Sequence, residues 1–225
     1  TYKNGISYYH ELINRFPLYK HSLLNKNTLP YADVNRFVED QNGNLWIGTN
    51  GGGLLYFDRK KNTYKQYLHN PNQPNSLSSN VIVSLWIDHE NKLWIGTYFG
   101  GLNSFDGKTF TRYTHNPADP TSIRDQNVWE IFEDSAHRLW VGTLSRGLEL
   151  FDRKTKTFTH FKSGDLNSVQ ASYISAIAED QAGNIWFGSD WGVSILMQQS
   201  GRFVQFVTDK KNPRSISSNA VLDIH

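Results

Sequence analysis

The sequence predicts an all-β fold built from four repeated units, and three observations lead to this prediction. Four tryptophans, each inside an apolar-Trp-apolar-Gly-Thr/Ser cluster, are spaced by 48, 46 and 46 residues: Trp46, Trp94, Trp140 and Trp186. Short runs of alternating apolar residues, typical of strands, surround every cluster. No long stretch shows the helical period. A repeat of this length indicates one supersecondary unit that recurs along the chain.

Each repeat contains four short segments that we expect to be strands. The first is an alternating run such as NVIVSLWID at 80–88, and the second is the LWIGT-type cluster. The third begins with Gly-Leu or Gly-Val and ends in Phe-Asp in three repeats, and the fourth carries two aromatics, as in FTRY at 110–113. Asn42-Gly43 between the first two segments is typical of a tight hairpin. Four strands at a period of about 46 residues match one antiparallel blade of a β-propeller.

This period divides a single predicted propeller domain, residues 1–225, into four complete blades and two partial ones. The complete blades are expected at residues 31–78, 79–125, 126–171 and 172–217. Residues 1–30 align with the outer half of a blade, and 218–225 with the first strand of another. We therefore expect an excerpt of a longer propeller.

The residues that recur in every blade are interpreted as structural. The four tryptophans are expected to act as wedges between neighbouring blades. The glycine that follows each one lets another backbone or side chain approach closely. These glycines are Gly48, Gly96, Gly142 and Gly188.

Three further repeated features are also predicted to be architectural. Acidic pairs such as Glu39-Asp40 recur at the first hairpin, where a carboxylate can accept hydrogen bonds from turn N–H groups. His69 and His115 occupy equivalent loop positions. In the loops between blades, an apolar residue such as Leu77 is expected to fill the gap between two blades.

Composition excludes several classes of function. The net charge of +2 gives no electrostatic argument for nucleic-acid binding. No apolar run is long enough to span a membrane. The absence of cysteine excludes thiolate metal sites and a cysteine nucleophile. The eight histidines form no HExxH motif, and no GxSxG motif is present. We therefore expect no catalytic residue, no metal and no cofactor in this chain.

The repeat resembles the two-component regulator propeller repeat over nearly the whole chain. The likeness rests on Glu39-Asp40, NGNLWIGT at 42–49 and GGL at 52–54, and nearly as well on 127–148. The resemblance implies a seven-bladed ring in the periplasmic sensor region of a membrane-anchored hybrid histidine kinase of the Bacteroidetes type. Such sensors respond to polysaccharide breakdown products. The resemblance also implies a homodimer, with the membrane helix and the kinase outside this chain.

The residues after the second strand of each repeat vary while the rest stays constant, as is common for binding loops on a rigid scaffold. We expect these loops to line one mouth of the central channel. Aromatic side chains there can stack on sugar rings, Arg146 can bind a carboxylate or sulfate, and Asp190 and Asn50 can hydrogen-bond hydroxyls. The alternative is that the aromatics only fill gaps between loops. The candidate residues are Asn50, Tyr98, Phe99, Arg146, Asp190 and Trp191.

Two further candidates lie on the expected innermost strands. Arg36 and Glu130 occupy a position that varies in charge, while the flanking Val34 and Val128 stay apolar. We expect both charged side chains to face the channel, where they either contact ligand or are simply hydrated.

The sequence as a whole predicts a ligand-sensing propeller segment that detects an oligosaccharide and has no enzymatic activity of its own. One alternative is a protein-interaction scaffold, and another is a propeller-type glycan lyase or hydrolase. A membrane helix and kinase motifs elsewhere in the full-length protein would distinguish a sensor from a scaffold. Turnover of glycans would identify an enzyme.

Overall fold

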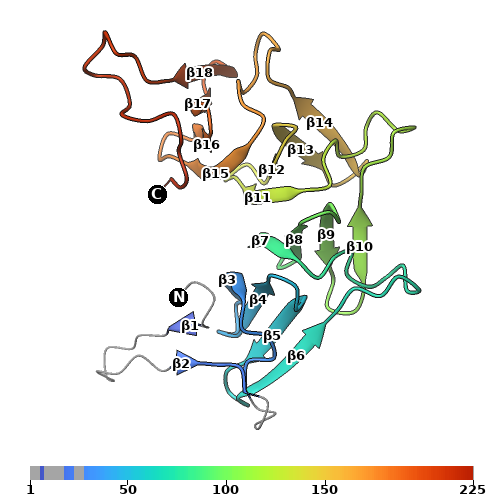
Figure 1. Cartoon of the computed structure of the whole chain (residues 1–225). Coiled ribbons are helices and arrows are strands. Elements are labelled where there is room, and N and C mark those ends of the chain that lie inside the picture. Colours follow the sequence, from blue (N-terminus) through green and yellow to red (C-terminus); the bar gives the residue numbers. More distant parts are fainter. Residues whose placement is uncertain (1–5, 8–17, 23–27, 225) are drawn as a thin grey trace. The chain divides into compact units, whose positions relative to one another are not determined.

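The computed structural model describes residues 6–7, 18–22 and 28–224, and this part of the chain contains strands and no helix. Four consecutive strands form each of four antiparallel four-stranded sheets (Figure 1). The predicted fold class is therefore confirmed. Because the described residues include no helix, none of them forms a helix able to cross a membrane.

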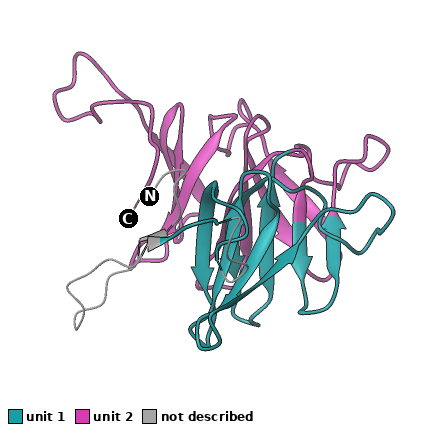
Figure 2. Ribbon diagram, turned by 60° about the horizontal axis from the view of Figure 1, so that its bottom comes forward, with its two compact units in different colours: residues 1–98, 103–112 teal, residues 99–102, 113–225 magenta. Residues whose placement is uncertain are grey.

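The chain divides into two compact units, coloured teal and magenta in Figure 2. The first comprises residues 1–98 and 103–112, and the second comprises 99–102 and 113–225. The strands assigned wholly or mainly to the first unit are β1 (Ile6–Ser7), β2 (Leu18–Tyr19), β3 (Val34–Glu39), β4 (Leu45–Thr49), β5 (Leu54–Asp58), β6 (Thr63–Tyr67), β7 (Ile82–Ile87), β8 (Leu93–Thr97), β9 (Leu102–Phe105) and β10 (Phe110–Tyr113). Strands β1 and β2 pair with each other, whereas β3–β6 and β7–β10 form two sheets.

The second unit contains the other two sheets, β11–β14 and β15–β18. Their strands are β11 (Val128–Glu133), β12 (Leu139–Thr143), β13 (Leu148–Asp152), β14 (Thr157–Phe161), β15 (Ile174–Glu179), β16 (Ile185–Ser189), β17 (Gly192–Met197) and β18 (Arg202–Phe206). Each of the four sheets falls within one of the four predicted blades. Residues 218–224 form no regular strand, and their assignment to a further blade stays a prediction.

The hairpin between the first two strands of each sheet is closed by an aspartate. Asp134 Oδ1 accepts hydrogen bonds from the backbone N–H groups of Ala136 and Arg138, at 3.0 and 2.8 Å. Its other oxygen, Oδ2, accepts the indole N–H of Trp140 at 2.8 Å. Asp88 and Asp180 bind their hairpins and their tryptophans in the same way. The predicted capping role is confirmed, and the aspartate also fixes the orientation of the tryptophan.

Acid is expected to weaken this arrangement in the fourth sheet. The side-chain hydrogen bonds from Trp186 and Asn184 lower the pKa of Asp180 to about 2. Because this folded-state pKa lies below the ordinary value of about 3.9, the stabilisation is present above that pH and is lost as the pH falls towards about 2. As the pH is lowered from about 3.9 to about 2, the urea concentration at the unfolding midpoint should fall more steeply for the wild-type chain than for Asp180→Asn. Parallel pH dependences would contradict the assignment.

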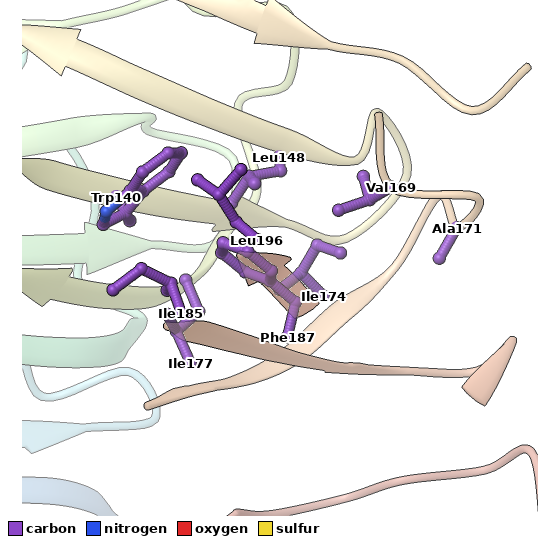
Figure 3. Close-up of a cluster of buried hydrophobic side chains, with 9 residues drawn as sticks. All are labelled: Trp140, Leu148, Val169, Ala171, Ile174, Ile177, Ile185, Phe187 and Leu196. Carbon is purple, nitrogen blue, oxygen red and sulfur yellow. The ribbon is translucent and has the colours of Figure 1, made fainter. Parts of the chain in front are cut away.

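Trp140 packs between the two sheets of the second unit, as predicted for the wedge. It is 1% exposed, and its ring centroid lies 5.5 Å from that of Phe187 on β16. Figure 3 shows Trp140 beside Leu148, Leu196 and Ile185, within a cluster of buried residues from both sheets.

The recurring glycines permit the same close packing. A Cβ atom on Gly142 would lie 2.8 Å from Ile174 Cγ2, and one on Gly48 would lie 2.5 Å from Ile82 Cγ2. The apolar loop residues Leu77 and Val169 are fully buried and belong to the cores of their units. Close packing at Gly48 and Gly142 and the burial of these loop residues agree with a structural role.

Candidate functional site

The loops singled out by the sequence connect the second and third strands of each sheet, at the end opposite the aspartate hairpin. In three of these loops, the hydroxyl of the last residue of the second strand donates a hydrogen bond to a glycine carbonyl at the far end of the loop. Thr49 Oγ1 donates to Gly53 O at 2.7 Å, Thr143 Oγ1 to Gly147 O at 2.8 Å, and Ser189 Oγ to Gly192 O at 2.8 Å. These bonds explain why Thr or Ser recurs after the glycine. Since both ends of the loop are fixed, the residues between them are free to differ.

In the first unit, Asn50 is held by Asp33, a residue that sequence reasoning missed. Asn50 Nδ2 donates to Asp33 Oδ2 at 3.0 Å, and its backbone N–H donates to Asp33 O at 2.8 Å. Tyr31 lies against the following glycines, so closely that a Cβ on Gly52 would be 2.2 Å from Tyr31 Cγ. The other candidate of this unit, Tyr98, is half-buried. The triple glycine at 51–53 was the one sequence signal that a side chain packs there.

A pocket of about 420 Å³ lies beside this loop. It is lined by His21, Pro30, Tyr31, Ala32 and Asp33. Asp33 Oδ1 is buried and has no hydrogen-bond partner among the described residues. A buried acceptor without a donor costs free energy, but because solvent does not reach this oxygen, it is not a contact point for a ligand in the pocket.

In the second unit, Phe99 has both an exposed ring and a strained backbone. Its side chain is 69% exposed, and its φ is 61°. Positive φ is rare for a bulky residue and clusters at functional sites. The conformation is fixed by Asn127, whose Oδ1 accepts the Phe99 N–H at 3.0 Å. The backbone carbonyl of Asn127 accepts the N–H of Leu144 at 3.1 Å, so the Phe99 and Arg146 loops are joined through one residue.

Arg146 is exposed, on a loop whose backbone is held rigidly. The backbone N–H and hydroxyl of Ser145 donate to Asp125 Oδ2 at 2.8 and 2.7 Å. Arg124 donates a further hydrogen bond to the carbonyl of Arg146. The backbone that carries the Arg146 side chain is therefore fixed, while the guanidinium extends into solvent. Sequence reasoning missed Asp125, because its partner is 20 residues away.

Asp190 and Trp191 form the loop of the fourth sheet, and both are exposed. The Trp191 side chain is 56% exposed. Its backbone is held at both ends, because its N–H donates to Ser189 Oγ at 3.0 Å and its carbonyl accepts Gln205 Nε2 at 3.1 Å. The indole is thus a large aromatic surface open to water on a short, anchored loop.

The first-strand candidates lie opposite the recurring glycines. Arg36 pairs with Gly48 and Glu130 pairs with Gly142, in each case next to a β-bulge. A bulge changes the direction in which a side chain points. Arg36 is exposed, whereas Glu130 is half-buried. Their role in ligand contact stays a prediction.

A buried carboxylate behind these loops is structural. Glu149 is fully buried in the third sheet, where Arg124 Nε approaches one of its oxygens at 3.1 Å and His160 Nδ1 contacts the other. Burial raises the pKa of Glu149, and the two basic partners offset part of that rise. Because both carboxylate oxygens are occupied and water is excluded, Glu149 is not placed to act as an acid or base on a ligand.

Comparison with known proteins identifies the repeat. The sequence model described as "Two component regulator propeller" matches residues 28–51, 122–145 and 168–191, which span the first two strands of three sheets. No curated protein matches the chain.

Several solved structures share the fold. One is the extracellular domain of BT4673, a candidate hybrid two component system from B. thetaiotaomicron. It superposes with a TM-score of 0.76 and a sequence identity of 21%, and the match covers 99% of this chain and 28% of that domain. The corresponding domain of BT3049 gives a TM-score of 0.56 and 22% identity, over 98% of this chain and 34% of that one. Virginiamycin B lyase from Staphylococcus aureus superposes with a TM-score of 0.67 and 16% sequence identity, over 94% of this chain and 66% of the lyase.

The chain thus spans about a third or less of the two extracellular domains. At these identities the superpositions establish the fold alone, whereas the three repeat matches establish the kind of repeat. The resemblance drawn from the LWIGT clusters is confirmed: the chain has the fold of a β-propeller segment, and three of its four sheets contain a match to the two component regulator propeller repeat.

Proposed function

We propose that this chain is the ligand-sensing segment of the periplasmic sensor region of a hybrid two-component system. The observation that carries this proposal is the match of three repeats to the two component regulator propeller. The fold shared with extracellular domains of two such candidate systems supports the location outside the cytoplasm. Signalling would pass to a histidine kinase outside this chain, in a receptor that we expect to be a homodimer.

The proposed ligand is an oligosaccharide derived from a polysaccharide. Support comes from the exposed aromatic rings of Phe99 and Trp191 and the fixed Arg146, all on loops at corresponding ends of their sheets. Aromatic surfaces beside a few placed polar groups are typical of specific small-molecule sites. Asn50 and the half-buried Tyr98 offer polar contacts in the first unit.

Calorimetric titration of the chain with short oligosaccharides from partly digested polysaccharides tests this proposal. We expect Phe99→Ala and Trp191→Ala each to weaken binding by about tenfold, the value of one lost aromatic contact. Phe37→Ala removes a ring that is 57% exposed from the middle of β3, where Phe37 pairs with Ile47 and not with these loops, and it should leave affinity unchanged.

Three results would redirect the proposal. Equal affinity of all three variants would move the site away from the loops. Appearance of cleaved sugar would favour the lyase or hydrolase alternative. Absence of binding by any oligosaccharide, with a partner protein retained instead, would favour the scaffold.

A further inference from the structure

A second concave surface lies at the opposite end of the first unit, beside the aspartate hairpins of its two sheets. This groove has a volume of about 550 Å³. Its walls are aromatic and apolar, with Trp46, Tyr67 and Phe105 among the lining residues. Charged residues from both hairpins line it as well, including Asp40, Glu90 and Lys92. Its size lies within the range of small-molecule sites.

Trp46, which lines the groove, does not follow the hydrogen-bond pattern of the other three tryptophans. Trp94 and Trp140 are 1% exposed and donate their indole N–H to Asp88 and Asp134 at 2.7 and 2.8 Å. Trp186 also keeps its bond to an aspartate, at 2.9 Å. Trp46 is half-buried, as Trp186 is, but its indole makes no hydrogen bond with the part of the chain that the structure describes.

Tyr56 takes the place of the indole on the aspartate of the first sheet. Its hydroxyl donates to Asp40 Oδ2 at 3.3 Å, and its ring centroid lies 4.6 Å from that of Trp46. Burial and the nearby Asp40 carboxylate raise the pKa of Tyr56, which keeps the hydroxyl protonated as a donor. The residues that pair with Trp140 and Trp186 in their own sheets are Leu150 and Ile195. Neither has a hydroxyl that could displace the indole from the hairpin aspartate.

The indole of Trp46 also lacks the cation that lies over Trp94 and over Trp140. Lys92 lies over Trp94, with 5.9 Å from Nζ to the ring centroid, and Arg138 lies over Trp140 at 5.3 Å from Cζ. The equivalent residue of the first sheet is Asn44, whose short side chain instead bonds to Asp40 and to the backbone N–H of Arg59. Among the described residues no cation lies over Trp46, and its partly exposed ring lines the groove beside Tyr56.

The charges around the groove restrict the ligand. Three carboxylates line it, on Asp40, Glu90 and Asp106, together with two ammonium groups, on Lys65 and Lys92. Lys65 Nζ already lies 4.6 Å from the centroid of Tyr67, so a second cation on that ring would be repelled. A strongly anionic ligand would face the carboxylates. The surroundings suit a neutral ligand whose hydroxyls both donate and accept hydrogen bonds.

We propose that this groove binds a neutral pyranose, either free or as the end unit of an oligosaccharide. The apolar face of the sugar ring packs on the exposed part of Trp46, and the indole N–H donates to a hydroxyl. Glu90 and Lys65 accept from and donate to other hydroxyls. The site is distinct from the loops that carry Phe99 and Trp191, because no residue of those loops lines the groove, and it does not depend on the proposed sensing function.

Titration of the chain with glucose, galactose, mannose and maltose, followed by saturation-transfer NMR and calorimetry, tests the proposal. At least one of these sugars should bind, and Trp46→Ala should weaken that binding by about tenfold. Galacturonic acid and glucosamine should bind more weakly than the neutral sugars. Preferred binding of either charged sugar would overturn the ligand class.

A second variant guards against a folding defect in Trp46→Ala. Asn44→Arg places over Trp46 the residue type that covers Trp140, and we expect it to block the groove while leaving the circular dichroism spectrum unchanged. Asn184→Arg is the matched control, because Asn184 makes the equivalent bonds in the fourth sheet. This control should bind sugar as the wild type does.

The outcomes separate the two sites. Retained affinity in both Trp46→Ala and Asn44→Arg, or no binding of any neutral sugar, would overturn the groove. If the same sugar is lost in Phe99→Ala and Trp191→Ala instead, it binds at the loops, which supports the proposed function and refutes the groove. Loss in the Trp46 and Asn44 variants alone establishes the groove, whatever the loops bind.

Discussion

Replacing Trp140 with alanine is expected to lower the free energy of unfolding of this chain by about 3–5 kcal/mol. The side chain is 1% exposed and packs against Phe161 in its own sheet and Phe187 in the next. Its removal creates a cavity between two sheets. It also leaves the fully buried Asp134 side chain without one of its donors, since Trp140 Nε1 bonds to Oδ2 at 2.8 Å.

Urea unfolding followed by circular dichroism measures this effect without relying on tryptophan fluorescence. Trp191→Ala is the control, because it removes the same side chain from a site that is 56% exposed, and its midpoint should change little. The urea midpoint of Trp140→Phe should lie between those of the two alanine variants, because phenylalanine keeps most of the apolar contact but cannot make the hydrogen bond. Equal midpoints for Trp140→Ala and Trp191→Ala would show that Trp140 does not act as a wedge.

Glu149→Ala is expected to have a similarly large effect, about 3–5 kcal/mol, because it breaks a buried ion pair and leaves the opposite charge behind. The Glu149 side chain is fully buried, whereas its partners Arg124 and His160 are 20% and 15% exposed. Once the carboxylate is removed, Arg124 must either stay poorly solvated or turn outwards. Turning outwards would also release its hydrogen bond to the carbonyl of Arg146.

The first sheet offers a matched control with the same chemistry and little burial. Arg59 Nη1 and Glu39 Oε1 are 3.1 Å apart, the same distance as in the Arg124–Glu149 pair, but the Glu39 side chain is 57% exposed. Because water screens this pair, Glu39→Ala should cost no more than about 1 kcal/mol. Comparable losses for Glu39→Ala and Glu149→Ala in urea unfolding would contradict the role of burial.

The strands and their cores could be predicted from sequence because their signals are local. The LWIGT clusters became β4, β8 and β12, and the aspartate of each hairpin bonds backbone groups only two and four residues away. His69 Nδ1 lies 2.7 Å from the carbonyl of Leu77, and His115 lies 2.9 Å from that of Ile123, which confirms that these histidines are repeat features. Because both partners of each contact lie within the same short motif, the contact recurs in every repeat that contains the motif.

The candidate site was predicted less completely. The loops lie at one end of their sheets, and Phe99 and Trp191 are exposed, but their role in binding stays a prediction. The residues that hold those loops were missed, among them Asp33, Asp125 and Asn127, because each acts on a residue 17 to 28 positions away. No motif joins such pairs in the sequence.

The sequence by itself determined the four-stranded repeat, its aspartate hairpins and its tryptophan wedges, since alternation, turn residues and hydrogen bonds within a few positions are sufficient for them. Tertiary structure alone decided where the pattern breaks. Trp46 reads the same as Trp140 in the sequence, yet it lines a groove, because Tyr56 from the neighbouring strand occupies Asp40. Glu149 resembles a solvated strand residue until Arg124 and His160 enclose it. Both outcomes depend on packing between strands, which competes with the local motif and cannot be read from it.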